Sequence, residues 1–132
     1  MVKLSLRGVI LRESLISKKL PTGLEKYLIN TQSITLGDLG KKVEVLTVSI
    51  PKSDLPGFAF AIADDLRPTG YYAHFIENND RLYIIYPKTI CIADRNNKET
   101  IAQCKKIGGI YSIPENQMPF ESMFDEDHPK ND

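Results

Sequence analysis

The sequence predicts an α+β domain, a two-layer sandwich with a mainly antiparallel sheet of about five or six strands and two helices on one face. Two observations lead to this fold class. Several short segments rich in β-branched and aromatic residues are separated by turn residues, which is typical of strands joined by hairpins. Two longer segments carry apolar residues at helical spacing. The predicted order of elements is β-β-β-α-β-β-β-α.

Three strands are predicted in the first fifty residues. Residues 4–10 alternate with a period of two, and Gly8 is interpreted as a bulge in that strand. Residues 24–35 fit either a short helix or a strand, and their β-branched side chains favour the strand. Turn residues then lead into residues 43–50, where a nearly continuous apolar run predicts an interior strand.

The first helix is predicted to follow Ser53, which is a favourable N-cap residue. Pro56 fits the first turn, where its missing N–H group costs little. Leu55, Ile62 and Leu66 recur at helical spacing, so we expect this stripe to lie on the sheet.

Three short strands and a second helix complete the predicted order. The strands cover residues 71–76, 81–86 and 88–93, and Asn78 with Asn79 suits a tight turn between the first two. A second helix is predicted to begin at Asn96 or Asn97 and to end at Gly108 and Gly109. The residues expected on its inward face are Ile101, Cys104 and Ile107.

The chain is predicted to form a single domain over residues 1–120, followed by an acidic, flexible tail over residues 121–132. With 132 residues, 42% of them hydrophobic and 26% charged, it resembles an average globular domain. Residues 121–132 contain five acids and one lysine, a net charge of −4, which is typical of a solvated tail.

Charge and cysteine content exclude several classes of protein. The 17 basic and 17 acidic side chains balance, which disfavours nucleic acid as a partner. Apolar runs are too short for a membrane span or signal peptide, and a cytoplasmic location is predicted. Cys91 and Cys104 do not form a disulfide framework or a zinc motif, which favours reduced thiols that act as small buried hydrophobic residues.

His74 is the principal candidate for acid–base chemistry, because the other histidine, His128, lies in the acidic tail. On its predicted strand His74 shares a face with Tyr72 and is expected to look outward with it. Arg95 follows the last strand and could bind an anionic substrate. A partly solvated sheet histidine is the simpler interpretation.

Other clusters favour structural interpretations. Asp64 and Asp65 are helix neighbours about 100° apart, so they do not converge on one ligand. The run from Gly37 to Lys42 lacks two defining positions of a phosphate loop, which favours a hairpin turn. Three lysine pairs (Lys18/Lys19, Lys41/Lys42 and Lys105/Lys106) would form an anion-binding patch only if the fold gathered them. No cofactor or metal site is predicted.

Four segments resemble a family of small uncharacterised prokaryotic proteins over residues 71–120. These are Tyr71–Phe75, Tyr83–Tyr86, Ile92–Arg95 and Ile113–Gln117 with Phe120. Ser112 departs from the glycine expected before the Ile-Pro pair. The resemblance implies one compact domain and no particular activity.

Two functional hypotheses follow from the sequence. The first is a non-enzymatic binding or protein-interaction domain, with a possible homodimer formed through an uncovered sheet edge or a tyrosine-rich face. The alternative is a small enzyme with a His74/Tyr72 acid–base centre that acts on an anionic small molecule.

Overall fold

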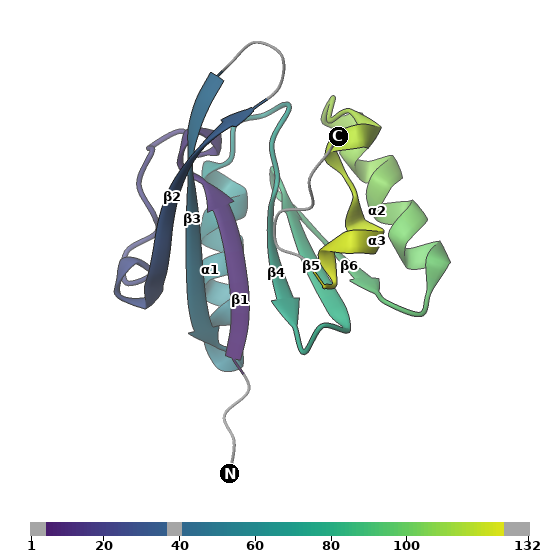
Figure 1. The fold of residues 1–132 in the computed structure, drawn as a ribbon, viewed down its shortest axis with the longest axis horizontal. Helices are drawn as coiled ribbons and strands as arrows, with labels where there is room; N and C mark the ends of the chain where they lie inside the picture. The colour runs from purple at the N-terminus through teal and green to yellow at the C-terminus, as the bar shows by residue number, and fades with distance from the viewer. Residues whose placement is uncertain (1–4, 37–40, 126–132) are drawn as a thin grey trace.

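The structure, a computed structural model, describes residues 5–36 and 41–125 (Figure 1). The strands are β1 (Ser5–Leu11), β2 (Leu28–Leu36), β3 (Lys41–Pro51), β4 (Ala73–Glu77), β5 (Arg81–Tyr86) and β6 (Thr89–Asp94). The helices are α1 (Leu55–Asp65), α2 (Lys98–Ile110) and α3 (Phe120–Met123). Short 3-10 turns are η1 (Arg12–Ser14), η2 (Glu25–Tyr27), η3 (Lys52–Asp54) and η4 (Glu115–Gln117).

All six strands form one antiparallel sheet in the order β2-β3-β1-β4-β5-β6. Both β3 and β4 pair with β1, so the connection through α1 crosses over that strand. The predicted α+β class, the antiparallel sheet and the element order through α2 are therefore confirmed. Residues 28–36 form a strand as predicted, and β3 occupies an interior position between β2 and β1.

The two long helices pack on opposite faces of the sheet, which differs from the predicted arrangement on one face. Successive strand residues point to opposite sides. Phe75 and Tyr83 belong to the same hydrophobic cluster as α1, whereas Ile76 and Leu82 belong to the cluster with α2. The described part of the chain thus forms three layers, with α1 on one side of the sheet and α2 with α3 on the other. We call these sides the α1 face and the α2 face.

On the α1 face, Gly8 permits close contact between two strands rather than a bulge. The β1 register with β3 and β4 is continuous through Gly8. A Cβ atom at this position would lie 2.6 Å from the ring of Phe75. The bulge instead lies in β2, between Leu28 and Asn30. The absence of a side chain at position 8 therefore gives Phe75 its place in the core.

Helix α1 covers this face with the predicted stripe. Leu55, Ile62 and Leu66 are all buried there. Asp54 stands at the N-cap instead of Ser53, and it makes no side-chain capping hydrogen bond. Burial of apolar surface therefore holds α1 on the sheet.

On the α2 face, the second helix has a side-chain cap. The Asn97 side chain accepts hydrogen bonds from the backbone N–H groups of Glu99 and Thr100, as predicted for this position. The helix continues through Gly108 and Gly109 to Ile110, beyond the predicted end. It continues because Gly108 is buried against Met118 and Tyr86, so packing outweighs the weak helix propensity of glycine.

Tight turns join the last three strands as predicted. Asn78 and Asn79 both have positive φ angles, 52° and 55°, between β4 and β5. Pro87 and Lys88 connect β5 to β6, where Lys88 has a φ of 58°. These turns keep the three strands in register.

The packed body extends past the predicted domain boundary at residue 120. Met123 and Phe124 are buried on the α2 face, because α3 turns their apolar side chains toward the sheet. Residues 126–132 of the predicted tail lie outside the described residues. None of the described helices is long and apolar enough to span a membrane.

Candidate functional site

His74 lies on β4 with only 4% of its surface exposed. It belongs to the α2 face, between Val9 of β1 and Ile84 of β5 in the strand register. The outward, partly solvated orientation expected from the sequence is therefore wrong. Strands on both sides and apolar neighbours in both of them enclose the imidazole.

Tyr72 shares the α2 face with His74 and serves a packing role. Its hydroxyl donates a hydrogen bond to the Gln117 carbonyl at 2.7 Å, and its ring meets Phe120 edge-on at 5.5 Å. Burial raises the pKa of the Tyr72 hydroxyl, which keeps it protonated near neutral pH. Tyr72 therefore acts here as a hydrogen-bond donor that holds the chain after η4 on the sheet.

Arg95 lies at a different end of the sheet. Its Nε donates to the Asn79 carbonyl at 2.7 Å, and its guanidinium forms an ion pair with Asp125 beside the Phe124 ring. The hydrogen bond with Asp125 raises the pKa of Arg95. Strand spacings place its backbone more than about 10 Å from that of His74. The structure thus brings His74 and Tyr72 to one face and leaves Arg95 apart.

Cys91 and Cys104 form a disulfide bond, so the expectation of reduced thiols is wrong. Their Cα atoms are 5.9 Å apart, within the normal range for such a bond. Cys91 lies on β6 and Cys104 on α2, 13 residues later. The sequence could not show this pair, because the two positions meet only when α2 folds back across the edge strand.

The other predicted clusters remain structural or lie outside the described residues. The Asp65 carboxylate accepts a hydrogen bond from the Ser17 hydroxyl at 2.5 Å, whereas Asp64 is exposed, so the two do not converge. Lys105 forms an ion pair with Glu121 at 2.7 Å. The glycine-containing turn at 37–40 is not described. Within residues 5–36 and 41–125, no three metal-ligating side chains gather.

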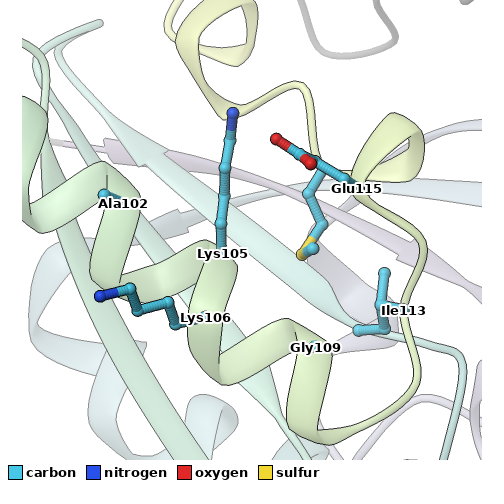
Figure 2. Close-up of a pocket in the computed structure, with 7 residues that line it drawn as sticks. Ala102, Lys105, Lys106, Gly109, Ile113 and Glu115 are labelled. Atoms are coloured by element: carbon cyan, nitrogen blue, oxygen red, sulfur yellow. The ribbon is translucent and has the colours of Figure 1, made fainter.

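A shallow groove of about 450 Å³ runs between α2 and η4 (Figure 2). Its lining residues are Ala102, Lys105, Lys106, Gly109, Ile113, Glu115 and Met118. Lys105 of α2 extends on the side of Glu115 and is already paired with Glu121, whereas the Lys106 side chain points away from Glu115. The groove therefore has no net charge that would select a ligand.

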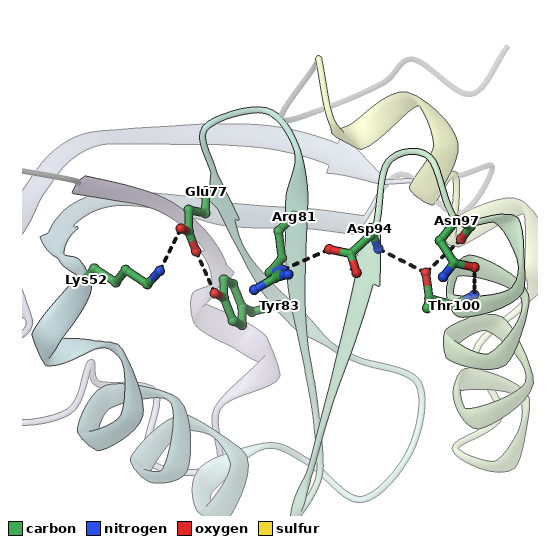
Figure 3. A network of polar contacts seen from close by, with 7 residues as sticks. All are labelled: Lys52, Glu77, Arg81, Tyr83, Asp94, Asn97 and Thr100. Carbon is green, nitrogen blue, oxygen red and sulfur yellow. Dashed lines mark hydrogen bonds and ion pairs between the residues drawn. The ribbon is translucent and has the colours of Figure 1, made fainter.

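A row of paired charges crosses one end of the sheet on the α1 face (Figure 3). Glu77 accepts from Lys52 at 2.8 Å and from the Tyr83 hydroxyl at 2.6 Å, while Arg81 donates to Asp94 at 2.8 Å. The hydrogen bonds from Lys52 and Tyr83 lower the pKa of Glu77. Burial, and then the hydrogen bond with Glu77, raises the pKa of Tyr83. Each charge has a partner, so this row fixes the strand ends.

The outer edge of β6 presents backbone hydrogen-bonding groups on alternate residues. The Arg95 N–H points back toward β5, where it donates to the Asp80 carbonyl, and the Asp94 N–H points away and donates to the Thr100 hydroxyl. These directions alternate along an antiparallel strand. The backbone N–H and C=O groups of Ile90 and Ile92 therefore also point away from β5, toward the open edge of the sheet. In the described part of the chain, no other element pairs with them.

Apolar side chains adjoin this edge on the α1 face. Ile92 is 46% exposed and Phe60 of α1 is 64% exposed, while Ile90 is half-buried. Phe58 packs on Tyr27 at the β2 side of α1. Phe60 is about 200° further around the helix, so it lies on a different flank of α1 from Phe58. We call Phe60, Ile90 and Ile92 the α1–β6 surface.

The α1–β6 surface was missed by sequence reasoning, although two signals for it exist. Residues 55–63 contain no charged side chain, which is unusual for a helix with a solvent-exposed face. Residues 89–93 contain no charge either. The tyrosine-rich face expected from the sequence is not present as such, because Tyr72 and Tyr86 pack under α2 and α3 whereas Tyr83 lies on the opposite face.

Comparison of this chain with protein-family models, with curated proteins and with solved structures gives no match. The resemblance over residues 71–120 therefore stays a prediction.

Proposed function

We propose that this protein is a non-enzymatic protein-interaction domain that forms a homodimer by antiparallel pairing of β6 with β6 of a second copy. The outward backbone groups of Ile90 and Ile92, beside exposed apolar side chains, carry the proposal. Addition of a strand satisfies such groups and provides affinity, while the alternate side chains provide specificity.

One register fits a symmetric pair of β6 strands best. A two-fold axis at Cys91 sets Ile90 opposite Ile92 of the second copy and lets their backbones exchange hydrogen bonds. The same register brings Lys88, in the turn before β6, toward Asp94 of the second copy, whose carboxylate also pairs with Arg81 of its own chain. If the pairing were shifted by two residues in one direction, Asp94 would lie opposite Ile90 of the second copy. A shift in the other direction would place Lys88 opposite Ile92, so neither shifted register brings Lys88 toward Asp94.

Phe60 extends the apolar contact from the strand to α1. In the proposed register the four isoleucines of the two copies form one strip on the α1 face, and each copy also exposes Phe60 on α1. A phenylalanine exposed over 64% of its surface gains from such burial. The equal numbers of acidic and basic side chains add no net repulsion between the copies.

Ile92→Lys tests the proposal against a matched change at the opposite edge, Ile29→Lys on β2. Both isoleucines are exposed on edge strands, so both variants should fold. We expect wild type and Ile29→Lys to sediment as dimers at micromolar concentration. Ile92→Lys should raise the dimer Kd about 100-fold, because it buries an unpaired charge.

A strictly monomeric wild type at high concentration would overturn the proposal. If Ile29→Lys dissociated the dimer and Ile92→Lys did not, the interface would lie at β2, and the proposal would be overturned as well. Lys88→Glu then tests the register, because it sets two acids against each other. It should weaken the dimer about tenfold at low salt and less at high salt.

A further inference from the structure

The disulfide between Cys91 and Cys104 joins the edge strand of the sheet to the middle of α2. It is a covalent link in a region that hydrogen bonds and apolar packing also hold together. The Tyr86 hydroxyl donates to the Cys104 carbonyl at 2.6 Å, and Ile101 on the same side of α2 is buried. The link can therefore open while the surrounding structure persists.

The two sulfur-bearing residues differ in access to solvent. Cys104 has no exposed surface and lies inside the cluster on the α2 face. Cys91 is only partly buried, because β6 is the last strand of the sheet. A thiolate from outside therefore reaches the sulfur of Cys91 before that of Cys104.

We infer that Cys91 is a thiol–disulfide exchange site, through which a dithiol reductant opens the link between β6 and α2. A thiolate of the reductant attacks Cys91 Sγ and forms a mixed disulfide, and the bond to Cys104 breaks. Cys104 Sγ takes the electron pair and then a proton. The second thiol of the reductant attacks the mixed disulfide and releases Cys91 as a thiol, so the reductant leaves with an internal disulfide.

Opening the link changes how α2 is attached to the sheet. In the oxidised protein α2 is bonded to β6, and in the reduced protein its apolar side and the hydrogen bond from the Tyr86 hydroxyl to the Cys104 carbonyl still hold it on the sheet. The inference does not depend on the proposed dimer. Because a dimer would bring a second copy close to Cys91, the exchange is measured at concentrations low enough to keep the protein monomeric.

Two single variants show which sulfur reacts. Cys104→Ser leaves the Cys91 thiol, and Cys91→Ser leaves the Cys104 thiol. Glutathione disulfide is the probe, and intact mass reports the adduct in native buffer. We expect Cys104→Ser to form the mixed disulfide at least about tenfold faster than Cys91→Ser. Equal rates, or a faster reaction in Cys91→Ser, would overturn the assignment to Cys91.

The wild type shows whether the native disulfide itself exchanges. Without reductant we expect no alkylation by iodoacetamide. With dithiothreitol in native buffer we expect two alkylated cysteines, at a rate proportional to dithiothreitol concentration. Alkylation without reductant would show that no disulfide forms, and reduction only in denaturant would show that exchange needs unfolding. Both results would overturn the inference, and neither bears on dimerisation measured by sedimentation.

Discussion

The two faces of the sheet are covered by different means. On the α1 face, a helix without charged residues over positions 55–63 packs on the strands through apolar side chains, and it has no side-chain cap. On the α2 face, a more polar helix begins with the Asn97 side-chain cap and is anchored to the sheet by a disulfide and by a tyrosine hydroxyl that donates to the Cys104 carbonyl. Because the end of α1 also accepts hydrogen bonds from Ser17 and Lys88, the two helices differ chiefly in the disulfide and in the side-chain cap.

This difference explains where the surfaces for interaction lie. Four of the seven exposed residues of α2 are polar, and the exposed isoleucine of this helix, Ile110, lies at its C-terminal end. The apolar composition of α1 instead leaves Phe60 in solvent, and Ile92 on the edge strand β6 is exposed as well. The α1 face therefore carries the exposed apolar side chains on which the proposed interaction rests.

Removal of the disulfide is expected to have the largest effect on stability and to act on the α2 face. The disulfide closes a loop between residues that are 13 positions apart. Changing both Cys91 and Cys104 to serine opens this loop in the unfolded chain, so we expect the free energy of unfolding to fall by about 3 kcal/mol. Chemical denaturation measures this loss. Amide hydrogen exchange shows where the variant loses protection. If α1 lost as much protection as α2, the idea that the disulfide stabilises mainly the α2 face would be contradicted.

Gly8→Ala tests the close contact on the α1 face. The new Cβ would meet the buried ring of Phe75 at 2.6 Å, so we expect a loss of about 2 kcal/mol in the free energy of unfolding. Gly57→Ala on α1 is the control, because no atom lies within 4 Å of its new Cβ. That change should stabilise the helix by about 0.5–1 kcal/mol. Equal effects of the two variants would contradict the contact.

Adjacent glycines in α2 provide a smaller, internally matched comparison. At Gly108 a Cβ would overlap Met118 and approach the Tyr86 hydroxyl at 2.9 Å, whereas at Gly109 it would meet nothing within 4 Å. Because the Met118 side chain can move, we expect Gly108→Ala to cost only about 1 kcal/mol. Gly109→Ala should be neutral or stabilising by up to about 1 kcal/mol. Thermal unfolding separates the two, and a reversed order would contradict the packing of Met118.

The charge row of the α1 face is expected to give the smallest effect, and one that depends on pH. The folded pKa of Glu77 is lowered, so its charge stabilises the fold above its ordinary pKa of 4.5 and this contribution is lost as the pH falls through the folded value. Glu77→Gln should cost about 1 kcal/mol or less at neutral pH and nothing in stronger acid. Glu115→Gln on the exposed rim of the groove is the control. A cost of Glu77→Gln that grows on acidification would contradict the pairing with Lys52.

Strands and turns were predictable from the sequence where local preferences decide the conformation. Asn78 and Asn79 tolerate positive φ angles, and Asn97 offers a side-chain acceptor to free N–H groups, so both features were predicted. The burial of His74 and the packing of Gly8 were not, because each depends on which strands lie beside β1 and β4. The sequence around a histidine on a strand does not indicate which other elements will cover its side chain.

The faces covered by α1 and α2 could have been inferred from one segment. Leu82–Tyr86 are five consecutive apolar residues, which is typical of a strand buried on both sides. This pattern indicates two covering layers, although it does not say which helix supplies each. The Cys91–Cys104 pair needs more information still, because it depends on the direction in which α2 returns across β6.

The sequence by itself determined the kinds of elements in this protein, their order and most of their turns, since these follow from side-chain periodicity and from the backbone freedom of a few residues. Only the tertiary structure decided the strand order, the face that each helix covers, the disulfide and the exposure of Phe60 and Ile92. These features arise from contacts between residues distant in the chain. Local patterns leave several such contacts equally possible, and close packing of the whole selects one.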